Sequence, residues 1–499
     1  MQGRGEVTRV TAYSKIEAPR RDRELDRRLL TLDDALALDN DRAMALYAAH
    51  LNRYMLQVYD ILGLRNMDVV SAQGCEIVLR DGRRILDFSG GFGVLGLGHN
   101  HPRVIAAERR CHDELVIDSI RVAPHKLQGA LARNIAQFLP EPLDVSFLTV
   151  SGAEANEAAM KLCDRVQAPK GKTKFLCMRG AFHGKTHGPL SLTTATDVQT
   201  GFLLGVPAEN VIYCRYGDIA SVREAIAREG GKDNAIVAVM VETLRGTSCE
   251  SPPPGYFNEL VDLCRANHIL TIFDEVKVGM GRTGRFCAFQ HEDAVPDVVT
   301  LAKTLGGGKR EMGAMVTSQA LFDRAYGDTP DANLHGSSFS SLGESCAVAI
   351  ETLNVLEEEQ LIERAGAMGA HLRAGLERLQ GKYPRCITSL RGKGCFQAIE
   401  LNFGQVIAAK VLDVRKNTLF VTWETVLVGA LTRELYERHG ILAHFQPGAR
   451  DLIHFMPPYV VTEDQIDRLI VALDDVLGRG IADATVRFVY KNVRRVLRR

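Results

Sequence analysis

The sequence has no excess of charge of either sign and no pattern of metal-binding cysteines. Its 61 lysines and arginines balance 61 aspartates and glutamates, so composition gives no basic signal for nucleic-acid binding. The 11 cysteines are scattered without a C-x-x-C motif, which argues against a zinc site and against a disulfide framework. We therefore expect reduced thiols in a reducing compartment, and no metal.

Long apolar runs are missing as well. No run reaches the roughly 20 residues that span a bilayer, and the N-terminal stretch has no apolar signal core, so we expect a cytoplasmic protein. At 499 residues, 46% of them hydrophobic and 24% charged, the chain has the composition of a globular protein. It is long enough to form two packed lobes.

The first 100 residues predict an arm and then a segment that packs with a smaller lobe. Residues 1–30 are polar and rich in arginine, which is typical of a mobile basic arm. The pattern over 31–62 is helical, and Thr31 with Asp34 predicts a capping box. The run "EIVLRDGRRILDF" predicts a hairpin that turns at its D-G pair. We assign 31–100 to this N-terminal segment.

After residue 140 short apolar runs alternate with helical stretches. The runs are "DVSFLTV", "TKFLCM", "AIVAVMV", "ILTIF", "DVVTLA" and "GAMVTS". Fully apolar strands that alternate with helices predict an α/β fold with a mostly parallel sheet covered on both faces. We assign 101–345 to this large domain. Residues 346–480, which begin with one long helical run, are assigned to a smaller α+β lobe, and 481–499 to a tail.

Two glycine-rich stretches resemble nucleotide-binding loops but differ from them in detail. In "RGAFHGKTHG" only three residues separate Gly180 from the G-K-T, where a P-loop has four. The run from Gly91 to Gly96 fits G-x-G-x-x-G, but no acidic residue follows at the distance that a dinucleotide site requires. We therefore reject a nucleotide as the ligand.

Chemically suited side chains follow four of the predicted strands, and ligands of parallel sheets bind beyond these strand ends. Ser151 opens a helix with an S-x-x-E capping box, and a helix start suits a phosphate. Phe182 and His183 follow the second apolar run, Asp274 the fourth and Lys303 the fifth. A phosphate cup, an aromatic ring, a carboxylate and an amine at one edge of a sheet match pyridoxal phosphate.

Longer motifs carry a family resemblance from about residue 55 to residue 475. In order they are "DFSGGFGVLGLGHNHPRV", "SGAEANEAAMKL", "AFHGKTHGPLSLT", "FDEVKVGMGRTGRFCAFQHEDAVPDVVTLAKTLGGG" and "RGKGCFQAIEL". With them the chain resembles the class III aminotransferases, fold-type I pyridoxal-phosphate enzymes such as ornithine, acetylornithine and putrescine aminotransferases. "GGFG", "AFHGK", "PPPGY" and "GMGRTG" are most similar to the putrescine-type branch.

The resemblance implies a role for each matched residue. Lys303 matches the lysine that forms the Schiff base, and Asp274 matches the partner of the pyridine nitrogen. Phe182 and Val276 match the residues on the two faces of the cofactor ring. The partner subunit of a homodimer is expected to supply Ser338 to the phosphate. The cofactor-binding residues predicted in all are Ser151, Gly152, Ala153, Phe182, His183, Asp274, Val276, Lys277, Lys303 and Ser338.

Lys277 stands where the family has glutamine, in "DEVK" instead of "DEVQ". Near the cofactor's 3′-oxygen its charge would favour the ionised oxygen. Alternatively, the side chain points away from the cofactor. The sequence leaves both interpretations open.

The residues that match the family's substrate site also differ. Phe92 replaces a tyrosine, Thr247 a glutamate, and His454 the arginine that grips an α-carboxylate. An imidazole does not replace a bidentate guanidinium without loss, so we predict a rebuilt carboxylate site. Arg245 and Arg450 are the candidates for another grip on the substrate.

Two further segments bear on the substrate. Residues 404–425, which contain Trp423, resemble an apolar insertion and predict either extra packing or a wall for a long substrate. The basic tail over 481–499 has valines at helical spacing. It is either a solvated helix or an amphipathic helix that contacts a membrane or an acidic carrier protein.

These features together predict a pyridoxal-phosphate aminotransferase. We expect its substrates to be a primary amine, or the corresponding aldehyde or ketone, long-chain or carrier-bound, and an oxo acid. A lyase, decarboxylase, mutase or epimerase on the same scaffold is the second class of function. A non-catalytic homologue is the third, and the retained Asp274 and Lys303 argue against it.

Overall fold

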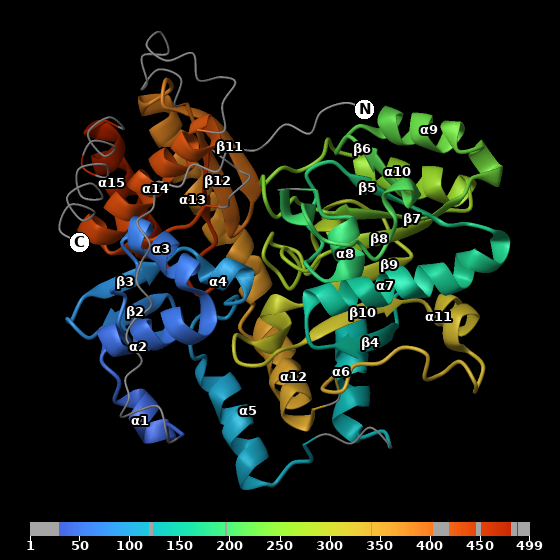
Figure 1. The fold of residues 1–499 in the computed structure, drawn as a ribbon, viewed down its shortest axis with the longest axis horizontal. Helices are drawn as coiled ribbons and strands as arrows, with labels where there is room; N and C mark the ends of the chain where they lie inside the picture. The colour runs from blue at the N-terminus through green and yellow to red at the C-terminus, as the bar shows by residue number, and fades with distance from the viewer. Residues whose placement is uncertain are drawn as a thin grey trace. The chain divides into compact units, whose positions relative to one another are not determined.

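The chain forms two compact units, Met1–Asp68 and Val69–Arg499 (Figure 1). The computed structural model describes residues 29–118, 123–194, 197–340, 342–402, 419–445, 451–480 and 487. Among these residues no helix is both long enough and apolar enough to cross a membrane. The predictions for the basic arm, Arg450 and the tail fall outside the described residues, as does most of the insertion with the Trp423 side chain.

The described part of the first unit is helical, as the pattern over 31–62 predicts. It contains α1 (Leu32–Leu36), α2 (Asn40–Tyr47), a π-helical stretch (Ala48–Asn52) and α3 (Arg53–Leu62). The predicted capping box is present at the start of α1. Asp34 N donates to Thr31 Oγ1 at 3.1 Å, and Thr31 N donates to Asp34 Oδ2 at 2.9 Å.

A seven-stranded sheet is the central element of the second unit, with the strand order β4-β10-β9-β8-β7-β5-β6. All strands run in one direction except β10, which is antiparallel to β4 and β9. The predicted α/β class with a mostly parallel sheet is confirmed. The strands are β4 (Val145–Thr149), β5 (Lys174–Met178), β6 (Val211–Cys214), β7 (Ile236–Glu242), β8 (Leu270–Asp274), β9 (Val298–Leu301) and β10 (Gly313–Thr317).

Helices cover both faces of this sheet because its central strands are apolar on both sides. Every residue of β7 is buried, and its apolar side chains contribute to two cores. One core includes α7 (Gly152–Gln167) and α11 (Gln319–Tyr326). The other includes α6 (Lys126–Gln137), α9 (Ile219–Arg228), α10 (Tyr256–Ala266) and α12 (Gly343–Glu358) (Figure 1).

Two smaller sheets complete the unit. The predicted hairpin is present as β2 (Glu76–Leu79) and β3 (Arg84–Asp87) in a sheet with β1 (Val69–Gln73) and β13 (Ile441–Leu442). Because β13 pairs with β3, part of the N-terminal segment lies against the C-terminal part of the chain. The second sheet contains β11 (Ile387–Lys393), β12 (Phe396–Leu401) and β14 (Leu452–Phe455).

The long helical run predicted from about residue 345 is helical, but a break that the prediction did not include divides it. The run is two helices, α12 and α13 (Leu361–Lys382), and Gln360 between them has a φ of +50°. This left-handed conformation ends the first helix and redirects the chain. The last two long helices of the unit are α14 (Leu419–His439) and α15 (Glu463–Gly478).

Candidate active site

A cavity of about 920 Å³ lies at the carboxyl ends of the parallel strands, and most of the predicted site residues line it. It lies wholly within the second unit. Its wall includes residues of the loops that follow β4, β5, β7, β8 and β9. The predicted residues that line it are Phe92, Ser151, Gly152, Ala153, Phe182, His183, Thr247, Asp274, Val276, Lys277 and Lys303.

Asp274, the last residue of β8, lies at the centre of a buried polar network. Its Oδ2 accepts a hydrogen bond from Asn156 Nδ2 at 2.9 Å and lies 2.8 Å from His183 Nδ1. Its Oδ1 accepts the backbone N–H of Val276 at 3.0 Å. These contacts fix the orientation of the Asp274 carboxyl group, which lines the cavity.

The start of α7 forms a narrow, donor-rich part of the cavity wall. Ser151 caps the helix by accepting a hydrogen bond from Glu154 N at 3.1 Å. Gly152 and Ala153 are the first two residues of the helix. A Cβ on Gly152 would lie 2.5 Å from Val276 Cγ1. A glycine is therefore required here, and the free N–H groups with the helix dipole suit a phosphate.

Lys303 follows β9 and brings an amine into the same cavity. Its φ of +51° is in the left-handed region, which residues with a side chain adopt less often than glycine. Burial lowers the pKa of the Lys303 ammonium to about 8, against the opposing charges of Asp274 and Glu242. More of this amine is therefore neutral, and so nucleophilic, near neutral pH than in an ordinary lysine.

Glu242, the last residue of β7, holds together two loops that line the cavity. Its Oε2 accepts Phe182 N at 3.0 Å and its Oε1 accepts Gly246 N at 2.8 Å. Burial raises the pKa of this carboxyl group. The loop that carries the predicted ring residue Phe182 is thus joined to the loop that carries Thr247.

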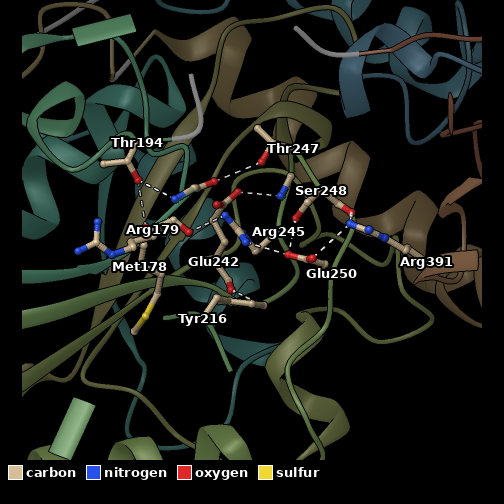
Figure 2. Close-up of polar contacts among 12 residues, drawn as sticks. Met178, Arg179, Thr194, Tyr216, Glu242, Arg245, Thr247, Ser248, Glu250 and Arg391 are labelled. Atoms are coloured by element: carbon tan, nitrogen blue, oxygen red, sulfur yellow. Dashed lines mark hydrogen bonds and ion pairs between the residues drawn. The ribbon is translucent and has the colours of Figure 1, made fainter. Parts of the chain in front are cut away.

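The structure does not bring Arg245 to the cavity. Figure 2 shows its guanidinium bridging neighbouring segments, where Nη2 donates to the carbonyl of Arg179 at 2.7 Å and Nη1 pairs with Glu250 at 2.8 Å. Its plane also lies over the Tyr216 ring, 5.2 Å from the centroid. Glu250 in turn pairs with Arg391 of β11 at 3.2 Å. Arg245 therefore braces neighbouring segments and does not line the cavity, and its role toward a substrate stays a prediction.

Lys277 lines the cavity, and its ammonium lies beside the 246–247 loop. Nζ donates to the carbonyl of Gly246 at 2.5 Å and lies 4.7 Å from the centroid of the Phe396 ring. Burial, and next the charge of Lys303, lower the pKa of Lys277 to about 7.

The three other substrate candidates lie at different depths. Phe92 lines the cavity and is 53% exposed, and its ring meets the edge of His444 with centroids 4.7 Å apart. Thr247 lines the cavity, and its carbonyl lies 2.9 Å from His454 Nε2. His454 is fully buried behind this loop and does not line the cavity. Burial lowers the pKa of His454 to about 3, so the ring is neutral.

Ser338 lies outside the cavity of its own chain, on an exposed turn. Its neighbour Ser337 donates from Oγ to Glu154 Oε2 at 3.2 Å, at the first turn of α7. The role of Ser338 across a dimer stays a prediction.

Sequence reasoning missed two residues of the polar network, Asn156 and Glu242. Asn156 donates to Asp274 and accepts Thr300 Oγ1 at 2.7 Å. It is a lone amide among the buried alanines of α7, and Glu242 is a lone acid at the end of an apolar strand. A buried polar group in an apolar run requires a partner, and this was the available signal.

The geometry agrees with what comparison with known proteins finds. The family model "Aminotransferase class-III" matches residues 63–477. The chain belongs to the class III aminotransferases. A putrescine aminotransferase from Pectobacterium atrosepticum is 32% identical over 405 residues, which are 80% of this chain and 79% of that protein.

Solved structures of transaminases share the fold. The ornithine aminotransferase of Toxoplasma gondii superposes with a TM-score of 0.74 at 27% identity, over 90% of this chain and 98% of that one. An (S)-enantioselective omega-transaminase from Thermomicrobium roseum gives 0.76 at 28% identity, over 88% and 99%. This class III aminotransferase therefore has fold type I and is a pyridoxal-phosphate-dependent transaminase.

The residues of the cavity fit pyridoxal 5′-phosphate. The Asp274 carboxylate can pair with a protonated pyridine nitrogen, and the α7 N-terminus beside Gly152 can hold the phosphate. Val276 leaves no room for a side chain at residue 152. With glycine there, the backbone N–H groups at the start of α7 stay accessible. Lys303 supplies an amine of lowered pKa.

Proposed function

We propose that this transaminase moves an amino group between a primary amine without an α-carboxylate and an oxo acid. One observation carries the proposal. Among the described residues that line the cavity, the only guanidinium is that of Arg310, and it is paired with Glu108 and Glu344. An amine such as putrescine, named for the Pectobacterium relative, has no carboxylate and requires no free guanidinium.

We further propose the following roles in the cavity. Lys303 forms the covalent link to the cofactor, and Asp274 keeps the pyridine nitrogen protonated, held in place by Asn156 and His183. Phe182 and Val276 pack on the two faces of the ring. The α7 N-terminus with Ser151, Gly152 and Ala153 binds the phosphate. The distances within the Asp274 network and the shared cavity lining support these assignments.

Pyridoxal phosphate, when bound, supplies an electron-withdrawing ring that weakens the Cα–H bond of the amine. The protein's own part is to orient groups and to move a proton. Lys303 Nζ, with its pKa lowered to about 8, can take up and release that proton near neutral pH. Asn156, His183 and the backbone N–H of Val276 hold the Asp274 carboxyl group in position beside the ring.

The walls of the cavity support a preference for alkyl chains. Phe92, Val94, Leu244 and Met312 line it together. Burial of each additional methylene contributes about 0.8 kcal/mol, or roughly a fourfold gain in kcat/KM. We therefore propose that the amine substrate is long-chain, either free or attached to a carrier.

A series of straight-chain primary amines of increasing length tests this proposal, with putrescine and ornithine for comparison. The conversion of the bound cofactor to its amino form is followed by its absorbance. We expect kcat/KM to rise about fourfold per CH₂ until the cavity is filled, and ornithine to be poor. A flat or falling trend, or a clear preference for ornithine, would contradict the proposal.

We also propose a homodimer in which Ser338 of one protomer completes the phosphate site of the other. Two observations support it. Ser338 is exposed on its own chain, and the turn that carries it does not line the cavity of that chain.

A further inference from the structure

The proposed reaction places the carboxylate of an oxo acid in the cavity, and some cation must receive it. This inference rests on the proposed function. Five described residues with cationic side chains line the cavity: Lys185, Lys277, Lys303, Lys309 and Arg310. We propose that Lys277 binds the carboxylate of the oxo-acid substrate.

The other four cations are engaged elsewhere or lie in solvent. Lys303 is assigned to the cofactor. Lys309 donates to Asn100 Oδ1, and Arg310 is paired with two carboxylates. Lys185 is exposed to solvent, where an ion pair contributes little. Lys277 lies in the cavity wall and is partly buried, and the contacts of its ammonium are a backbone carbonyl and an aromatic ring.

Lys277 has no carboxylate partner among the described residues. Its ammonium carries three donors, of which one is directed to the carbonyl of Gly246, while the Phe396 ring covers another side. A half-buried cation held only by a carbonyl and an aromatic face retains capacity for an anion. Removal from water strengthens such a pair relative to one on the surface.

The Lys277 side chain packs against the 246–247 loop. A Cβ on Gly246 would lie 2.8 Å from Lys277 Cδ, so the loop leaves room for this side chain only because residue 246 is glycine. The same loop is held by Glu242 at Gly246 N and by His454 at the carbonyl of Thr247. The ammonium is therefore held in place before the substrate arrives, which lowers the entropic cost of binding.

The charges around Lys277 give the interaction a pH dependence. Burial and Lys303 lower the pKa of Lys277 to about 7, and a bound carboxylate favours the charged form and raises this pKa. Binding of a carboxylate should therefore weaken as pH rises above about 7, where free Lys277 loses its proton. The charged and titratable groups that face Lys277 are Glu242, Cys249, Arg282, Lys303, His444 and His454.

Measuring the two half-reactions of the holoenzyme separately distinguishes binding of the oxo-acid carboxylate by Lys277 from an effect of Lys277 on the cofactor. In Lys277→Met the side-chain length is kept and the charge is lost. We expect kcat/KM for pyruvate or 2-oxoglutarate, acting on the amino form of the cofactor, to fall about 10- to 100-fold. The amine half-reaction should fall much less. Lys232→Met removes the charge of an exposed lysine that does not line the cavity, and as the matched control it should change neither half-reaction.

Calorimetric titration of the holoenzyme with propionate, a carboxylate that cannot react, gives a readout besides activity. We expect tighter binding at about pH 6 than at about pH 8, and loss of this difference in Lys277→Met. If the variant instead lowers both half-reactions equally and shifts the cofactor's absorbance, Lys277 acts on the cofactor and the proposal is wrong. Failure of the native enzyme to react with any amine would contradict the proposed function instead.

Discussion

At Gly180 the absence of one Cβ sets how closely two loops approach. A Cβ built there would lie 1.7 Å from Arg245 Nη2, in the guanidinium that donates to the carbonyl of Arg179 and pairs with Glu250. Gly180 also precedes Phe182, which is proposed to stack on the cofactor. A side chain at residue 180 would therefore displace both the Arg245 guanidinium and the Phe182 ring.

A matched pair of glycine substitutions tests this dependence. Gly180 and Gly171 have φ angles of +80° and +75°, and nothing lies within 4 Å of a Cβ on Gly171. Gly171→Ala should lose only the backbone cost of about 1–2 kcal/mol. Gly180→Ala should lose about 1–3 kcal/mol more and should bind the cofactor more weakly, because the Arg245 contacts are displaced. Urea unfolding and absorbance titration with pyridoxal phosphate measure both, and equal losses would show that Arg245 braces nothing.

At the scale of elements, the sequence predicts those helices and strands that have a clear local pattern of apolar residues. All six predicted strands are present because each is a short apolar run between turn or helix signals. β6 (Val211–Cys214) was missed, since it has four residues and lies at the edge of the sheet with only half of them buried. The break between α12 and α13 was missed because no glycine or proline marks it, and Gln360 adopts the left-handed conformation instead.

In the candidate site, too, some residues could be placed from sequence pattern and others could not. Asp274 and Lys303 could be placed from sequence because both follow apolar strands, and all such ends meet at one edge of a parallel sheet. The direction of a side chain depends on tertiary packing, which the sequence does not reveal. Arg245 therefore lies behind the wall and Asn156 within it, and neither could be placed by spacing alone.

At the scale of the whole molecule, the proposed homodimer predicts that two inactive variants restore one active site. Ser338→Ala and Lys303→Ala each remove one contribution to a shared site, so hybrid dimers should contain one site with both native residues. Refolded or co-expressed mixtures should recover up to about a quarter of the native kcat, because statistical pairing makes half of the dimers hybrid. If hybrids form and stay inactive although both single variants are inactive, the two residues act within one protomer.

Borohydride reduction of the holoenzyme, followed by peptide mass mapping, tests most directly whether Lys303 carries the cofactor. Reduction fixes pyridoxal phosphate to the amine that holds it. Four lysines line the cavity, namely Lys185, Lys277, Lys303 and Lys309, so the position of the label discriminates among them. We predict the label on Lys303, the one that follows directly on β9. A label on Lys277 or Lys185, with Lys303 unmodified, would contradict the assignment of the site.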